Sequence, residues 1–103
     1  GLPMEIWHSR EGISTYPSMA EFLTAVIDFR ATGAKLNSTY EYDKETGLKL
    51  FGKTAFFVST GDGFSTFLRK PDADAFAAKS AGMVMDLEGA LEASQKLMKV
   101  SAL

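Results

Sequence analysis

The side chains with the most distinctive chemistry in this sequence are its five methionines and its single histidine. Met83 and Met85 are two residues apart, which places both thioethers on one face of a strand. Met4 and His8 share the parity of a second strand in the same way. Because thioether sulfur is neutral and soft, it selects Cu(I) over Zn(II). These four residues are therefore candidate metal ligands, although core packing of methionine and a surface position for histidine are the simpler explanations.

Other kinds of chemistry find little support. The chain has no cysteine, which excludes disulfides, thiolate metal sites and cysteine nucleophiles. A single histidine supplies neither a catalytic triad nor a tetrahedral zinc site. Asp62, Asp72 and Asp74 could act as paired catalytic carboxylates, but turn formation and helix capping account for all three. We therefore predict that the protein is not an enzyme.

Composition places the chain among small folded proteins. Of its 103 residues, 46% are hydrophobic and 12% aromatic, enough for the core of a single domain spanning 1–103. The net charge of −2, with lysines and arginines scattered, argues against nucleic acid as a partner. No apolar run approaches the ~20 residues that span a bilayer. Because so small a core is marginally stable, a homo-oligomer is one expected state.

One order of elements is predicted twice: strand, glycine turn, strand, proline, helix, glycine, strand. The first copy, about 4–42, has strands at 4–8, 13–16 and 36–42. Its helix follows Pro17 and starts with Ser18 and Glu21 at capping-box spacing. The apolar face of this helix repeats at helical spacing and consists of Met19, Phe22, Leu23, Val26 and Ile27.

The second copy, about 54–87, predicts strands at 54–59, 64–68 and 83–87. Its helix is expected at 73–80, after Pro71, with Asp72 or Asp74 as the cap and Gly82 as the stop.

A polar turn at 43–47 and an apolar run at 48–51 join the copies, and a last helix covers about 88–100, beginning at Asp86 or Glu88. The predicted fold class is α+β: two ββαβ units with antiparallel sheet and a C-terminal helix in one compact domain. The predicted core consists of Phe22, Val26, Phe56, Val58, Phe76, Val84 and Leu91.

Two stretches carry a resemblance to a known family. "YEYDKETGLKLFGKTAFFVSTG" (40–61) resembles an Asp-x-x-Thr-Gly turn followed by an Ala-aromatic-aromatic-Val strand, and "DADAFAAKSAGMVMDLEGAL" (72–91) resembles an Ala-x-x-Phe-Ala helix, a glycine and a final strand. Both are similar to the NosL-type family, the copper-binding accessory lipoproteins of nitrous oxide reductase. The resemblance implies two related ββαβ units, Cu(I) as cargo, a metal-acceptor protein as partner, an upstream lipid anchor, and a periplasmic or otherwise extracytoplasmic location.

The chain departs from the family where the family binds copper. The Cys-x-Met motif near the N-terminus is missing, and Gly63-Phe64-Ser65 stands near the place of a Pro-Met-Gly. The family's ligand set is therefore not carried over, and Met4 and His8 are the nearest soft ligands to the missing motif.

Two functions remain open. One is a Cu(I)-handling accessory domain that passes the ion to a partner. The alternative is a binding or assembly module of the same fold that has lost metal binding. Such a module would engage a protein or small ligand through an exposed aromatic surface around Trp7, Tyr16 and Phe64.

Overall fold

The computed structural model describes residues 3–8, 12–33 and 36–102. In chain order, the elements of this part are β1 (Met4–His8), β2 (Gly12–Tyr16), α1 (Met19–Ala31), β3 (Leu36–Tyr42), β4 (Lys49–Phe51), β5 (Phe56–Thr60), β6 (Gly63–Phe67), α2 (Lys70–Ser80), β7 (Met83–Met85) and α3 (Leu87–Ala102). The strands form a four-stranded sheet, β2-β1-β3-β4, and a three-stranded sheet, β6-β5-β7. All pairings within both sheets are antiparallel.

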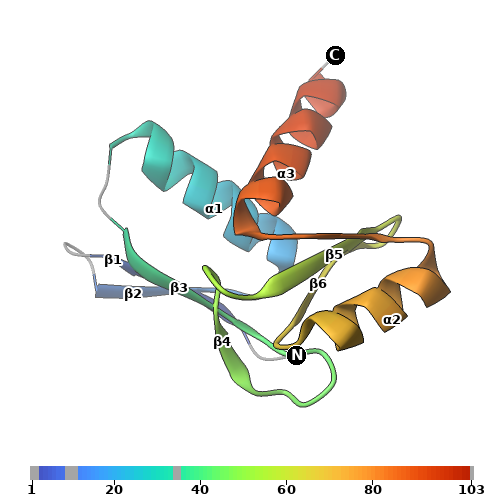
Figure 1. Ribbon diagram of the computed structural model, residues 1–103. Coiled ribbons are helices and arrows are strands. Elements are labelled where there is room, and N and C mark those ends of the chain that lie inside the picture. The colour runs from blue at the N-terminus through green and yellow to red at the C-terminus, as the bar shows by residue number, and fades with distance from the viewer. Residues whose placement is uncertain (1–2, 9–11, 34–35, 103) are drawn as a thin grey trace.

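The predicted repeat is present in the order of the elements. Each unit consists of a hairpin, a helix and a returning strand, β1-β2-α1-β3 and β5-β6-α2-β7. In each sheet the first strand of the unit lies between the other two, and β4 adds an edge strand to the first sheet. Helix α1 packs on β1 and β2, α2 on the three-stranded sheet, and α3 against α1 and β5 (Figure 1). The predicted α+β class is confirmed.

Helix α1 begins as its sequence predicts. The Ser18 hydroxyl accepts from the backbone N–H of Glu21 at 3.2 Å and donates to the Glu21 carboxylate at 3.1 Å. This satisfies one of the unpaired N–H groups of the first turn. The apolar face buries Phe22, Leu23 and Val26 in the main core.

Helix α2 differs from its prediction at both ends. It begins at Lys70, three residues before the expected start, because proline is tolerated in a first turn whose N–H groups have no partner. Neither predicted aspartate is the cap: the N-cap is Arg69, without a side-chain bond, and Asp74 pairs with Lys70 at 3.0 Å. At the other end, Ala81 and not Gly82 takes the left-handed conformation, with φ of 55°.

Gly82 is needed for a different reason. A Cβ at this position would lie 2.7 Å from the Ser59 carbonyl oxygen of β5. The glycine therefore lets the chain pass close to β5 as it leaves α2 and enters β7.

The core prediction is correct for four residues and wrong for three. Phe22, Val26, Val58 and Leu91 are buried, whereas Phe56, Phe76 and Val84 are only partly buried and pack around a smaller cluster. That cluster lies between α2 and the three-stranded sheet and is built on Val58, Phe67 and Ala73. On β5, the fully buried phenylalanine is Phe57, which faces the main core.

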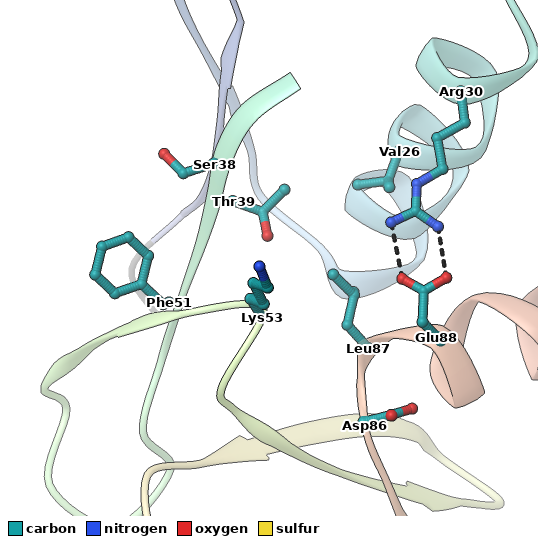
Figure 2. A pocket seen from close by; sticks show the side chains of 9 residues that line it. All are labelled: Val26, Arg30, Ser38, Thr39, Phe51, Lys53, Asp86, Leu87 and Glu88. Atoms are coloured by element: carbon teal, nitrogen blue, oxygen red, sulfur yellow. Dashed lines mark hydrogen bonds and ion pairs between the residues drawn. The ribbon is translucent and has the colours of Figure 1, made fainter. Parts of the chain in front are cut away.

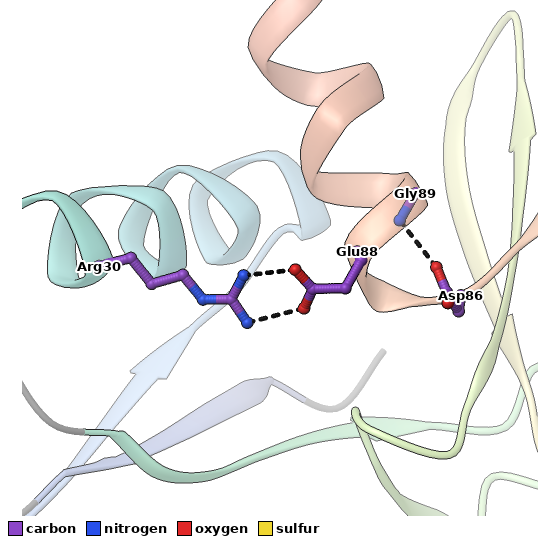
Figure 3. Close-up of polar contacts among 4 residues, drawn as sticks. All are labelled: Arg30, Asp86, Glu88 and Gly89. Atoms are coloured by element: carbon purple, nitrogen blue, oxygen red, sulfur yellow. Dashed lines mark hydrogen bonds and ion pairs between the residues drawn. The ribbon is translucent and has the colours of Figure 1, made fainter.

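Helix α3 begins at Leu87, between the two predicted starts Asp86 and Glu88. Asp86 accepts from the Gly89 N–H at 2.8 Å, and Glu88 forms a double ion pair with Arg30 of α1 at 2.7 and 2.8 Å (Figure 3). Both side chains of this pair are well exposed, so its contribution to stability is small, about 0–1 kcal/mol. The buried stripe runs from Leu87 to Ser94 and ends before Leu97, which is 62% exposed where α3 extends beyond both sheets (Figure 1).

A cluster of hydrogen bonds around Asp43 joins the two sheets. One carboxylate oxygen accepts from the Thr46 N–H at 2.7 Å and the Thr46 hydroxyl at 2.6 Å, closing the turn before β4. The other accepts from the Leu68 N–H at 2.7 Å, at the end of β6. Two further bonds lie beside it: the Thr66 hydroxyl donates to the Tyr42 carbonyl, and the Lys44 N–H donates to the Thr66 carbonyl. Through these hydrogen bonds, the predicted polar turn connects the two repeats. We call this group of bonds the Asp43 tie.

Replacing Asp43 by Ala should destabilise the protein by about 3 kcal/mol, because two backbone N–H groups lose a charged acceptor in a site where Asp43 is 2% exposed. Burial acts to raise the pKa of Asp43, but the bonds from Thr46 and Leu68 outweigh it and hold the pKa below its usual 3.8. Its stabilising effect should therefore be present above that usual pKa and disappear as the pH falls through the lower folded-state value.

Urea denaturation of the two proteins measures this difference. The matched control is Asp28→Ala, which removes an exposed carboxylate from α1. Equal losses for the two variants would show that Asp43 does not tie the sheets together.

Candidate functional site

The four-stranded sheet has two chemically different faces. Met4, Ile6, Thr39, Glu41 and Leu50 point to the inner face and are buried. The opposite face carries three aromatic rings in a row, from Trp7 to Tyr40 to Phe51, with ring centroids 5.2 and 5.0 Å apart. No described helix packs on this outer side, and Phe51 is 55% exposed.

A charged pair lies on the aromatic row. Lys49 Nζ is 4.7 Å from the centroid of Tyr40 and 5.6 Å from that of Trp7, within the range of a cation–π contact. The same ammonium group is 3.0 Å from Glu5 Oε1, which also accepts from the Trp7 indole N–H at 2.8 Å. The bonds from Trp7 and Lys49 lower the pKa of Glu5, so its carboxylate is ionised at neutral pH. We call Glu5, Trp7, Tyr40, Lys49 and Phe51 the aromatic face.

A groove of about 480 Å³ lies beside Met4 of β1 and next to the hydrogen bonds of Asp43. Two methionines, Met4 and Met19, line it together with the ring of Phe64 and the turn that follows β3. Met4 is 8% exposed and belongs to the main core, against which Met19 and Phe64 also pack. The groove thus places two thioether side chains on one wall, and only Met4 of these was a predicted ligand.

The four predicted metal ligands lie on two sheets. Met4 is in β1, and the backbone of His8 ends that strand opposite Gly12 and Leu36, although its side chain lies outside the described residues. Met83 and Met85 are in β7, an edge strand of the three-stranded sheet. Met83 is 69% exposed, while Met85 is partly buried against the main core. The described residues contain no group of three or more histidine, aspartate or glutamate side chains that could hold a metal ion.

The three predicted aromatic residues are not gathered on one surface. Trp7 is on the aromatic face. Tyr16 points to the opposite side of the sheet and makes an edge contact with Phe22, at 6.4 Å between centroids. Phe64 lies in the groove beside Met4. Tyr40 and Phe51 were not predicted as partners of Trp7, because β1 reaches them only by pairing with β3, which is far from it in the sequence.

A second cavity, of about 560 Å³, lies between the first sheet and the two helices α1 and α3 (Figure 2). The Arg30–Glu88 pair forms one wall, with Asp86 below it. On the other side, Figure 2 shows the amine of Lys53 directed towards the Thr39 side chain. The cavity combines both signs of charge.

Glu41 is buried near this cavity without a partner. Its side chain is 0% exposed, and neither carboxyl oxygen has a hydrogen bond among the described residues. Burial raises the pKa of Glu41 to about 8, so the group is mainly neutral at pH 7. Gly52 makes room for it, because a Cβ there would lie 2.7 Å from Glu41 Oε1 and against the Thr39 hydroxyl. The alternation Tyr40-Glu41-Tyr42 was the sequence signal for an inward-pointing carboxyl.

The buried carboxyl predicts a pH dependence of stability. The folded protein keeps a proton on Glu41 that the unfolded chain releases above pH 4.5, so stability should fall as the pH rises from 4.5 to about 8. The slope from this one group is at most about 1.4 kcal/mol per pH unit. Glu41→Gln cannot ionise and should lack this decline. Urea denaturation of both proteins across this range tests it, and parallel pH profiles would contradict the burial of a neutral Glu41.

The described elements form a small α+β protein with two ββαβ units. A solved structure shares this architecture: the copper chaperone NosL from Shewanella denitrificans, with a TM-score of 0.71 and 18% sequence identity. The match covers 84% of this chain and 75% of the NosL chain. No protein-family profile matches the sequence, and no curated protein matches it.

The resemblance to NosL predicted from the sequence is therefore confirmed at the level of the fold. The structural neighbour is named a copper chaperone, and the expectation that this chain is not an enzyme stays a prediction. No helix in the described part of the chain is long and apolar enough to cross a membrane.

Proposed function

We propose that this chain is a non-catalytic accessory domain that handles Cu(I) and transfers it to an acceptor protein outside the cytoplasm. The observation that carries the proposal is the fold shared with a copper chaperone over 84% of the chain. Because the chain has no cysteine, its soft donors are thioether groups, which select Cu(I), while the imidazole of His8 is a borderline donor that also suits copper. Coordination by such neutral groups is weak, which suits an ion that must be released again.

The candidate copper donors differ in how far their side chains are exposed to solvent. The Met83 thioether is largely exposed on an edge strand, and Met85 follows it on the same face of β7. Met4 is almost completely buried, so it must move to bind an ion, and His8 is its predicted companion on β1. We therefore assign the first contact with Cu(I) to Met83 and Met85, and a secondary role to Met4 and His8.

Anaerobic titration with Cu(I) in the presence of a competing chromophoric chelator tests this function. The double variant Met83→Leu, Met85→Leu should lose at least about tenfold in affinity, since leucine fills a similar volume but has no donor atom. The double variant Met4→Leu, His8→Ala should lose less. Met98→Leu is the matched control, because it removes a methionine of α3 that is not a predicted ligand.

Two results would refute the copper function. One is an unaltered chain that binds no more Cu(I) than a protein without methionine. The other is equal affinity in all variants, which would show that the predicted donors take no part.

A second function, a binding module of the same fold without metal, is supported by one observation. The aromatic face holds three contiguous rings, of which Phe51 is 55% exposed and Trp7 and Tyr40 are half-buried, on a sheet surface that no described helix covers. Contiguous apolar surfaces of this kind mark interaction sites in soluble proteins.

A further inference from the structure

A positively charged side chain of the protein itself, that of Lys49, already occupies the aromatic face. Lys49 Nζ lies over two rings and 3.0 Å from the Glu5 carboxylate. Its side chain is 41% exposed and projects from β4, a three-residue edge strand. An exposed lysine side chain on such a strand can swing into solvent at little cost. The groups that hold Lys49 would then be available to a cation from outside.

The groups left after removal of Lys49 match a guanidinium better than an ammonium. The Trp7 and Tyr40 rings offer flat faces, on which a planar guanidinium stacks. Glu5 is ionised, and its side chain is only 16% exposed. The N–H fork of arginine can bind both oxygens of a carboxylate, whereas lysine acts as a point charge.

The size and charge of the face indicate what kind of partner carries the arginine. Four strands spaced by ~4.8 Å and about five residues long give a flat area of roughly 300 Å². Two such faces would bury roughly 600 Å² in total, well below the ~1,200 Å² of a stable interface between folded proteins, so the area suits a short peptide segment better than a second copy of this chain. The protein has a net charge of −2, which favours a basic partner.

We propose that the aromatic face docks a basic segment of a partner protein, with an arginine side chain replacing Lys49 between Glu5 and the rings of Trp7 and Tyr40. This inference rests on the binding-module function and names the chemistry of its partner. It uses none of the methionine donors proposed for copper, because Met4 points to the opposite face of the sheet, and Met83 and Met85 belong to the other sheet.

The only tryptophan of the chain reports directly on this site. The probe is the peptide acetyl-Gly-Arg-Gly-Arg-Gly-amide, titrated while Trp7 fluorescence is recorded. Matched peptides carry lysine or glutamine in place of arginine. We expect saturable binding with the order arginine, lysine, glutamine, and weaker binding at high salt.

Two variants test the assigned contacts. Lys49→Met removes the competing cation and should raise the affinity for the arginine peptide at least about threefold. Glu5→Gln should lower that affinity at least about tenfold. Lys44→Met is the matched control: it removes a lysine that lies over Phe76, 5.4 Å from the ring centroid and on a different surface, and should not alter binding. If Glu5→Gln does not fold, the result for Lys49→Met tests the proposal by itself. This variant should fold, because the Lys49 side chain is on the surface.

Several outcomes would overturn the inference. They are no saturable change with the arginine peptide, an unaltered affinity in Lys49→Met, or sedimentation showing that the aromatic face is occupied by a second copy. Equal binding of the glutamine peptide would also overturn it, yet would leave the binding-module function standing. Failure of the Cu(I) titration has no bearing on any of these results.

Discussion

The bonds around Asp43 are the constraint on which the arrangement of the two repeats depends. A single carboxylate accepts from the turn that leads into β4 and from the end of β6, so one side chain belongs to both sheets. Two neighbouring bonds, from Thr66 to Tyr42 and from Lys44 to Thr66, join the same segments. Hydrophobic packing is not directional, and these bonds therefore set how the second unit lies beside the first. The groove beside Met4 exists because the sheets meet at this point.

Strand alternation divides the first sheet into two independent surfaces. The inner face is occupied by the core and includes a neutral carboxyl, Glu41, whose burial costs stability as the pH rises. The outer face holds rings and an ionised Glu5 in contact with Lys49. Glu5 and Glu41 lie on neighbouring strands but on opposite faces, and the pKa of Glu5 is lowered whereas that of Glu41 is raised. A substitution on one face should leave the chemistry of the other largely intact.

The shared architecture with a copper chaperone and the lack of cysteine point to a variation on one scaffold. A ββαβ unit keeps its fold as long as the hairpin, the helix face and the returning strand are retained. The ligands on such a scaffold can change without loss of the fold, because exposed positions such as Met83 contribute little to packing. The shared fold therefore does not identify a bound species.

By itself, the sequence determined the order of the elements, the cap at Ser18, the buried face of α1 and the turn at Asp43, because these depend on residues within a few positions of one another. It did not determine which of Phe56 and Phe57 reaches the main core, since both faces of β5 are covered. Only the tertiary structure decided that Trp7 meets rings from β3 and β4 and that Glu41 is left without a partner. Those contacts arise because β1 pairs with β3, which is far from it in the sequence, and because the helices pack on one side of the sheet. A local sequence pattern indicates neither.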